Sequence, residues 1–188
     1  MFVEIQRMLV IGIDPGTRYL GWGLVRRDGS RLIHIGHGVI ETTKTEALAI
    51  RLVEIDAELS AIIEKYRPDA GAVETLFFHK DAQAASKLGH ARGVVLLALC
   101  RAAISIAEYS PALVKRTIVG RGAADKRQVA LIVKAALGLN ELPRADATDA
   151  LALAMTHLRV AHLPILPRAP ARSKNKLPPQ LVARLRRN

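Results

Sequence analysis

The sequence predicts an α/β fold built on one mixed five-stranded sheet flanked by helices. Two observations carry this prediction: three consecutive strand-like segments open the chain, and helices then alternate with strands. Short connections give antiparallel neighbours, whereas a helix between two strands gives parallel ones. We therefore expect three antiparallel strands followed by two parallel strands.

The first three strands are expected at 9–14, 21–27 and 31–42, because these segments are rich in apolar and β-branched residues. Asp28-Gly29 between the second and the third is the signal of a tight hairpin. The three segments together predict an antiparallel meander.

In the rest of the chain, segments with the apolar periodicity of a helix alternate with strand-like segments. A helix is expected at 45–66, where apolar residues recur at helical spacing, with Thr45 as its start and Pro68 beyond its end. Strands are expected at 70–77 and 104–110, and helices at 81–103, 111–119, 125–139 and 146–161. The order β-β-β-α-β-α-β-α-α-α is that of ribonuclease H-like proteins.

The length of 188 residues fits one domain, expected at 1–163, followed by a tail at 164–188. The tail is rich in proline and contains no acid, so we expect it to be mostly disordered. Seven of the 28 lysines and arginines lie there, which leaves +4 of the formal charge of +11 for the body. This charge favours nucleic acid as a partner, although a solubilising tail is an alternative.

The single Cys100 excludes an internal disulfide and a cysteine-based zinc cluster, and it indicates a reducing, cytoplasmic location. Glu4 and Arg7 interrupt the segment where a signal peptide would need apolar residues. The longest apolar run, 93–100, is far shorter than the roughly 20 residues that span a bilayer. No membrane association is expected.

Two carboxylates stand near the ends of predicted strands. Asp14 ends the first strand, before Pro15-Gly16, and Glu74 follows small and apolar residues in 70–77. Burying an unpaired carboxylate is unfavourable, so each needs a partner or a cation. The alternatives are a simple turn for Asp14 and an outward-facing residue on an edge strand for Glu74.

Asp146 and Asp149 open the last predicted helix, and their spacing places them on one face of its first turn. Capping is the alternative, with Asp146 as the N-cap and Asp149 as a variant of the capping-box acid. Four acids brought together would repel one another unless divalent cations neutralised them, and oxygen ligands select Mg²⁺ or Mn²⁺. Two such ions would support phosphodiester hydrolysis.

Five segments in order, GIDPGTRYLGWG, AVETLFF, KLGHARGV, VKRTIVGRGAADKRQV and RADATDALALAMTH, closely resemble the RuvC family of Holliday-junction resolvases over about residues 8–157. The resemblance implies a homodimeric, Mg²⁺-dependent endonuclease that nicks two opposed strands of a four-way DNA junction symmetrically. It implies that Asp14, Glu74, Asp146 and Asp149 bind the metal, with two ions in each site and Mn²⁺ as a substitute. Family members also work with the branch-migration proteins RuvA and RuvB.

The resemblance also suggests DNA contacts. Lys115 and Lys126 match basic residues near the site, suited to phosphate or to charge developing in the transition state, and Phe77 matches an aromatic that packs against bases. Solvated lysines and a core phenylalanine are the alternatives. Lys87 and Arg92 are further candidates for phosphate contact. Thr75 and His90 stand where glutamine is expected in better-known members.

Three other functions compete. An actin-like or sugar-kinase ATPase would need a second lobe with its own phosphate loop, which this length does not provide. An RNA-processing nuclease of the YqgF type would keep the fold but fits the segments around Lys115 and the paired aspartates less well. A non-catalytic junction-binding scaffold would gain from losing negative charge next to phosphate.

Overall fold

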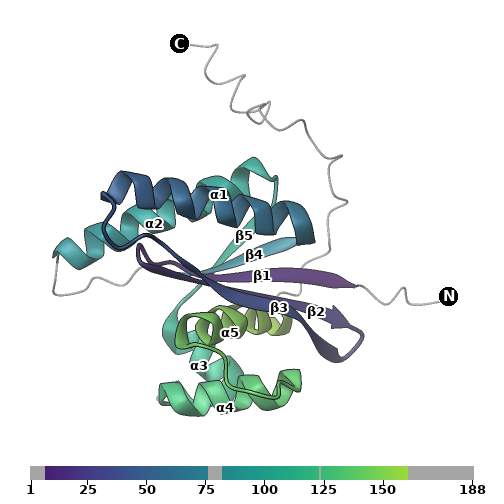
Figure 1. The fold of residues 1–188 in the computed structure, drawn as a ribbon. Coiled ribbons are helices and arrows are strands. Elements are labelled where there is room, and N and C mark those ends of the chain that lie inside the picture. The colour runs from purple at the N-terminus through teal and green to yellow at the C-terminus, as the bar shows by residue number, and fades with distance from the viewer. Residues whose placement is uncertain (1–6, 76–81, 123, 161–188) are drawn as a thin grey trace, which may run out of the picture.

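The computed structural model describes residues 7–75, 82–122 and 124–160, in which one sheet lies between two layers of helices (Figure 1). The strands are β1 (Met8–Asp14), β2 (Tyr19–Asp28), β3 (Arg31–Glu41), β4 (Ala70–Glu74) and β5 (Ser105–Tyr109). The helices are α1 (Leu48–Tyr66), α2 (Ala82–Arg101), α3 (Pro111–Val119), α4 (Lys126–Leu137) and α5 (Ala145–Val160). The predicted order of elements is confirmed.

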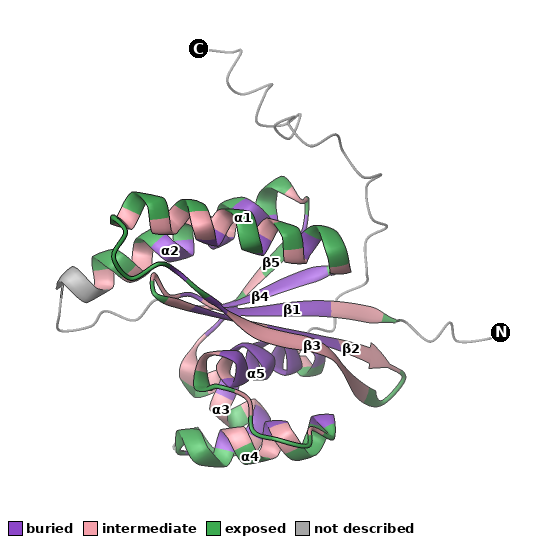
Figure 2. Ribbon diagram, viewed as in Figure 1, coloured by how far each residue is buried: buried purple, intermediate pink, exposed green. Residues whose placement is uncertain are grey.

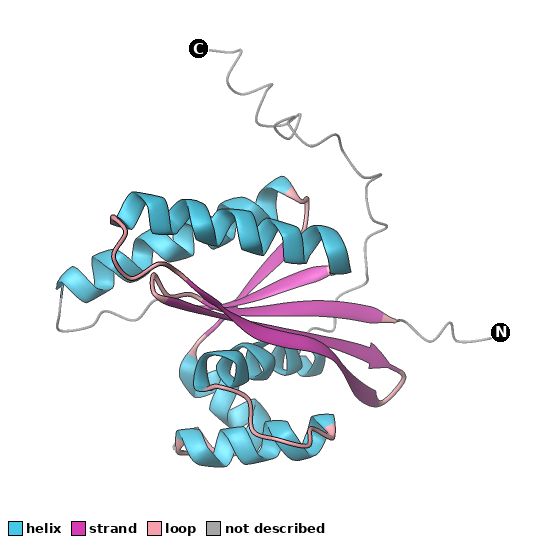
Figure 3. Cartoon of the chain, in the orientation of Figure 1, coloured by secondary structure: helices cyan, strands magenta, loops and turns pink. Residues whose placement is uncertain are grey.

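The sheet has the order β3-β2-β1-β4-β5. β1 pairs antiparallel with β2, and β2 with β3, whereas β1 pairs parallel with β4, and β4 with β5. The predicted mixed sheet is therefore confirmed (Figure 3). The hairpin turn lies one residue later than its signal, because Asp28 still pairs with Arg31 and leaves Gly29-Ser30 as the loop, with Gly29 at a φ of 62°.

Alternation along β1 assigns its side chains to two cores. Val10 packs with α3, α4 and α5 on one face of the sheet, whereas Ile11 and Ile13 pack with α1 and α2 on the other. Figure 2 shows the resulting pattern, with α5 buried between the sheet and the outer helices. Even-numbered residues of β1 therefore face α5, and Asp14 continues that series.

Helix ends follow local chemistry. α1 begins at Leu48 rather than at the predicted Thr45, and it ends at Tyr66 because Arg67 turns left-handed, at a φ of 50°, ahead of Pro68. Ser110 caps α3 by accepting a hydrogen bond from the Leu113 N–H at 3.3 Å. No helix within the described ranges is long and apolar enough to cross a membrane. The predicted tail, 164–188, lies outside the described residues, so its disorder stays a prediction.

Candidate active site

Asp14 is the last residue of β1, a central strand, and its register partner on β2 is Gly21. Directly opposed residues of antiparallel strands project to the same face, so Asp14 and Gly21 both face α5. The loop that follows Asp14 is anchored, because the carbonyl oxygen of Thr17 accepts hydrogen bonds from Thr42 Oγ1 at 2.8 Å and from Arg51 Nη2. Asp14 therefore sits in a fixed frame rather than in a free turn.

Three glycines let α5 approach the sheet closely. A Cβ atom at Gly21 would lie 2.0 Å from the backbone oxygen of Asp146, and one at Gly12 would lie 1.9 Å from that of Ala150. At Gly23, an added Cβ would lie 2.8 Å from Leu151. Backbone atoms cannot move away from such a contact without moving the helix. These glycines, which the sequence analysis missed, bring the first turn of α5 beside Asp14; their alternate spacing at 21 and 23 was the available signal.

Asp146 is the second residue of α5, which begins at Ala145, and the Thr148 N–H donates to the Arg144 carbonyl oxygen at 2.9 Å. The capping alternative is therefore wrong: Asp146 lies inside the helix, and Asp149 lies one turn further along. Negative charge in the first turn is stabilised by the unpaired N–H groups there. Both aspartates are half-buried.

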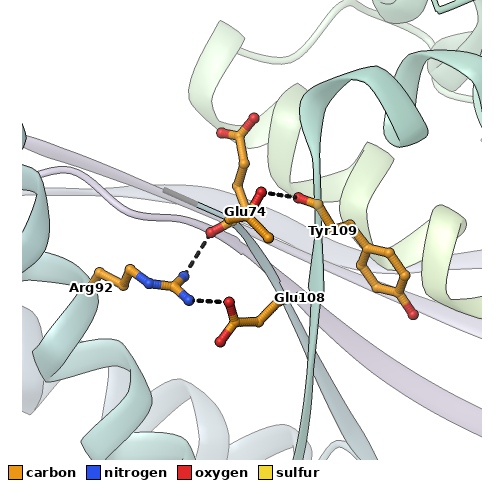
Figure 4. A network of polar contacts seen from close by, with 5 residues as sticks. Glu74, Arg92, Glu108 and Tyr109 are labelled. Atoms are coloured by element: carbon orange, nitrogen blue, oxygen red, sulfur yellow. Dashed lines mark hydrogen bonds and ion pairs between the residues drawn. The ribbon is translucent and has the colours of Figure 1, made fainter. Parts of the chain in front are cut away.

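Glu74 ends β4, which lies between β1 and β5, so the edge-strand alternative is wrong as well. Ala70 and Ala72, four and two residues earlier, pack in the α5-side core, so Glu74 projects to the same face as Asp14. Figure 4 shows the Glu74 side chain pointing away from Arg92, which approaches from α2 on the opposite face. The sheet and α5 thus bring Glu74, Asp146 and Asp149 within electrostatic range of Asp14.

The pKa of Asp14 reflects its burial and the nearby acids. Its pKa is raised from 3.8 to about 7, first by burial and then by the negative charges of Asp149, Glu74 and Asp146. The positive charge of Lys126 acts in the opposite direction. Asp14 is half-buried, and its neighbours carry more negative than positive charge, which is the electrostatic character of a cation site.

Lys126, the first residue of α4, is the cation that lies beside these acids. Its Nζ lies 3.2 Å from Asp149 Oδ2, and the charge of Asp149 is the main cause of its raised pKa, to which Asp14 and Glu74 also contribute. Lys126 therefore stays protonated beside the acids. Lys115 is half-buried on α3 and, among the contacts of the described residues, it forms no hydrogen bond or ion pair with Asp14, Asp146 or Asp149.

A pair of arginines borders the site. The guanidinium carbons of Arg18 and Arg144 lie 5.2 Å and 4.8 Å from the centre of the Tyr19 ring, and both arginines are exposed. Arg18 is the last residue of the loop after Asp14, and Arg144 directly precedes α5. Arg144 also forms an exposed ion pair with Glu41 at 3.2 Å. Two cations from distant segments thus share one aromatic ring at the edge of the acid group.

The remaining predicted contacts are dispersed. Phe77 lies outside the described residues. Lys87 and His90 are exposed on α2. Arg92 is only 8% exposed, and its guanidinium donates to the Glu74 carbonyl oxygen at 2.6 Å and pairs with Glu108. The Thr75 N–H donates to the Tyr109 carbonyl oxygen at 2.9 Å, so it extends the β4–β5 ladder.

Within the described ranges, no three His, Cys, Asp or Glu side chains converge closely enough to form a preformed metal cluster. Carboxylates that share one region repel one another, and Asp149 is instead drawn to Lys126. The donor set nevertheless fits a hard cation, because it consists of carboxylate oxygens around the acid whose pKa is raised.

Comparison with known proteins shows that the chain is similar to one family of nucleases. A sequence model described as "Crossover junction endodeoxyribonuclease RuvC" matches residues 10–157. The RuvC of Sorangium cellulosum is 63% identical over 154 residues, which cover 82% of this chain and 86% of that protein. The RuvC of Acidiphilium cryptum is 48% identical over 165 residues, covering 88% and 98%. The solved structure of T. thermophilus RuvC in complex with Holliday junction substrate superposes with a TM-score of 0.78 at 39% identity, covering 82% and 94%.

Proposed function

The chain belongs to the RuvC family of crossover junction endodeoxyribonucleases, and from this we propose that it resolves Holliday junctions by metal-dependent hydrolysis. It nicks two opposed strands of a four-way DNA junction symmetrically, in recombination and repair. The observation that carries this proposal is the group of four carboxylates around Asp14, on a chain whose relative was solved with a Holliday junction. Family membership also favours DNA over the RNA substrates of the alternative nuclease.

Asp14, Glu74, Asp146 and Asp149 are the proposed metal ligands. Four carboxylates without sulfur or imidazole suit Mg²⁺, with Mn²⁺ as a substitute. A pair of such ions held by these carboxylates would supply activation of the attacking water and charge stabilisation of the leaving oxygen. Because a ligand must be ionised, Asp14 gives up its proton when it binds a cation.

The lysines act on the phosphate in this proposal. Lys126 is held protonated next to Asp149, so its ammonium group donates to a phosphate oxygen as negative charge develops there. Lys115 serves the same phosphate from α3, and replacing it lowers the cleavage rate more than the affinity for the junction. An unchanged rate in Lys115→Ala would return this residue to an ordinary surface role.

The rest of the proposed DNA surface comprises Phe77, for stacking on bases near the crossover, Lys87 on α2 and the exposed pair Arg18 and Arg144. Exposed arginines at the edge of an acidic site bind the phosphates on either side of the one that is cut. Arg92 has its guanidinium committed to protein groups, so we no longer assign it to DNA.

We also propose a homodimer, because two equivalent sites match the two-fold arrangement of the junction. Large apolar side chains are exposed on the helical layer opposite α5, with Ile50 and Val53 on α1 and Leu97 on α2. Burial of this layer against a second copy would cover them. Action on chromosomal junctions places the enzyme in the cytoplasm, together with the branch-migration proteins RuvA and RuvB.

The direct test incubates the purified protein with a synthetic four-way junction or the matching linear duplex, in Mg²⁺ or in EDTA, and maps the cuts on every strand. Paired symmetrical nicks that are confined to the junction and need Mg²⁺ are expected. Binding without cutting would support a scaffold instead, and equal cutting of the linear duplex would remove junction specificity.

A further inference from the structure

Arg92 is a buried cation directly behind Glu74. It is 8% exposed, and Nη1 donates to the Glu74 carbonyl oxygen at 2.6 Å, whereas Nη2 pairs with Glu108 on β5. Figure 4 shows this arrangement: the guanidinium bridges the ends of two strands, and the Glu74 carboxylate projects to the other side. Burying an arginine is unfavourable unless its donors are satisfied, so these contacts account for its place.

Register explains why the Glu74 carbonyl oxygen needs a side-chain donor. The Thr75 N–H bonds to Tyr109 on β5, so the neighbouring peptide groups of β4 alternate between β5 and β1. The parallel pairing of β1 with β4 runs to Ile13 and Val73. If it continued, the N–H of residue 15 would face the Glu74 carbonyl oxygen, but Pro15 has no N–H.

We propose that Arg92 is a positioning residue for Glu74, in that it supplies the ladder donor which Pro15 removes and is itself held by Glu108. Pro15 turns the chain away after Asp14, and Arg92 keeps the end of β4 in register despite the lost hydrogen bond. Glu74 therefore reaches the acid group from a fixed strand end. This inference deepens the proposed function and rests on it.

The arrangement predicts that the effect of Arg92 on the position of Glu74 can be separated from its effect on the stability of the fold. Arg92→Leu alone leaves Glu108 without its ion pair, but that side chain is 45% exposed and stays solvated, so the lost pair costs little stability. The double variant Arg92→Leu with Glu108→Leu removes both charges, and like the single variant it lacks the Arg92 donor to the Glu74 carbonyl oxygen. Arg92→Lys keeps a donor and a positive charge, so it recovers part of the function.

The experiment measures single-turnover cleavage, junction affinity in EDTA, Mn²⁺ affinity by calorimetry without DNA, and thermal unfolding. For the double variant we expect near-native unfolding and junction affinity, a cleavage rate lower by about 100-fold, and weaker Mn²⁺ binding. Arg92→Lys is expected between this variant and the wild type. The matched control is Arg101→Leu, which removes an exposed ion pair with Asp56 from the same helix and leaves cleavage unchanged.

A double variant that folds, cleaves and binds Mn²⁺ like the wild type would overturn the positioning role. The positioning role would also be overturned if Arg92→Lys cleaved no faster and bound Mn²⁺ no more tightly than the double variant. That result would mean that a donor at residue 92 has no effect. If the wild type itself did not cut junctions, the proposed function would fail, whereas the Mn²⁺ affinities would still decide the role of Arg92.

Discussion

Gly21 and Asp146 are in backbone contact: a Cβ atom at Gly21 would lie 2.0 Å from the Asp146 backbone oxygen. Gly21 is also the register partner of Asp14. One position on β2 therefore sets how close the first turn of α5 comes to the carboxylate at the end of β1. The absence of a side chain at residue 21 is thus part of the geometry of the acid group.

Gly21→Ala should push α5 away from the sheet. Because the obstructing atoms are backbone, relief requires a shift of the helix, and we expect a loss of about 2 to 4 kcal/mol in unfolding free energy. Junction cleavage should fall by at least about 10-fold in the variant that remains folded, since Asp146 moves relative to Asp14.

Gly36→Ala is the control, because the atoms nearest to an added Cβ there belong to the Tyr66 and Trp22 side chains, at 3.5 Å or more. It should cost less than about 1 kcal/mol. Urea unfolding and single-turnover cleavage measure both variants. Equal effects of the two substitutions would mean that the approach of α5 at Gly21 is not special.

Replacement of any one of the four acids by its amide should reduce cleavage by at least about 1,000-fold and leave junction affinity within a few-fold. The amide keeps the size of the side chain but loses the charge that a metal ligand needs. Asp56→Asn, which breaks an exposed ion pair away from the site, is the control. Full activity in Asp14→Asn, Glu74→Gln, Asp146→Asn or Asp149→Asn would remove that residue from the site.

The pKa of Asp14 predicts a pH-dependent gain of stability in Asp14→Asn. The folded pKa of about 7 lies above the ordinary 3.8, so between these values the folded protein binds more protons than the unfolded chain. Unfolding free energy attributable to Asp14 therefore falls as pH rises through this window. In EDTA, the stability of the variant relative to the wild type should increase by about 2 to 3 kcal/mol from pH 5 to pH 8.

Thermal or urea unfolding at several pH values tests this expectation, and added Mg²⁺ should stabilise the wild type at pH 8 but not the variant. A stability difference that does not vary with pH would show that the environment of Asp14 does not favour the protonated form.

The fold was predictable because its signals are local. Each signal acts through residues that are neighbours in sequence. Examples are the apolar strand that ends at Asp14, the hairpin residues near Gly29 and the end of the helix before Gly120. The contacts of Gly21 were not predictable, because their partner lies on a helix far along the chain. The sequence offers Arg92 as a candidate phosphate contact, whereas the structure buries it. The α2 sequence is small and apolar on more than one face, so it holds no pattern that distinguishes a buried arginine from an exposed one.

The sequence names the four acids, but the boundaries of helices and strands decide between the alternative interpretations of each one. Asp146 resembled an N-cap only as long as the helix was taken to start after it, and α5 begins at Ala145. Likewise, Glu74 could be an edge residue until the sheet order placed β4 between β1 and β5. Tertiary neighbours, rather than local sequence, separated these alternatives.

The arginine pair at Tyr19 should contribute to DNA affinity through phosphate contacts. Each phosphate contact made by a cation adds close to 0.9 to the slope of log affinity against log salt concentration on duplex DNA, so Arg18→Ala with Arg144→Ala should lower that slope by about 2. Cleavage at saturating junction should change little, because these arginines lie beside the acids rather than among them.

Lys65→Ala is the matched control, since Lys65 lies 5.0 Å from the centre of the Tyr66 ring on α1 and should not alter the slope. Fluorescence anisotropy with a labelled junction over a range of salt concentrations gives both slopes, and an unchanged slope in the double variant would exclude the pair from phosphate contact.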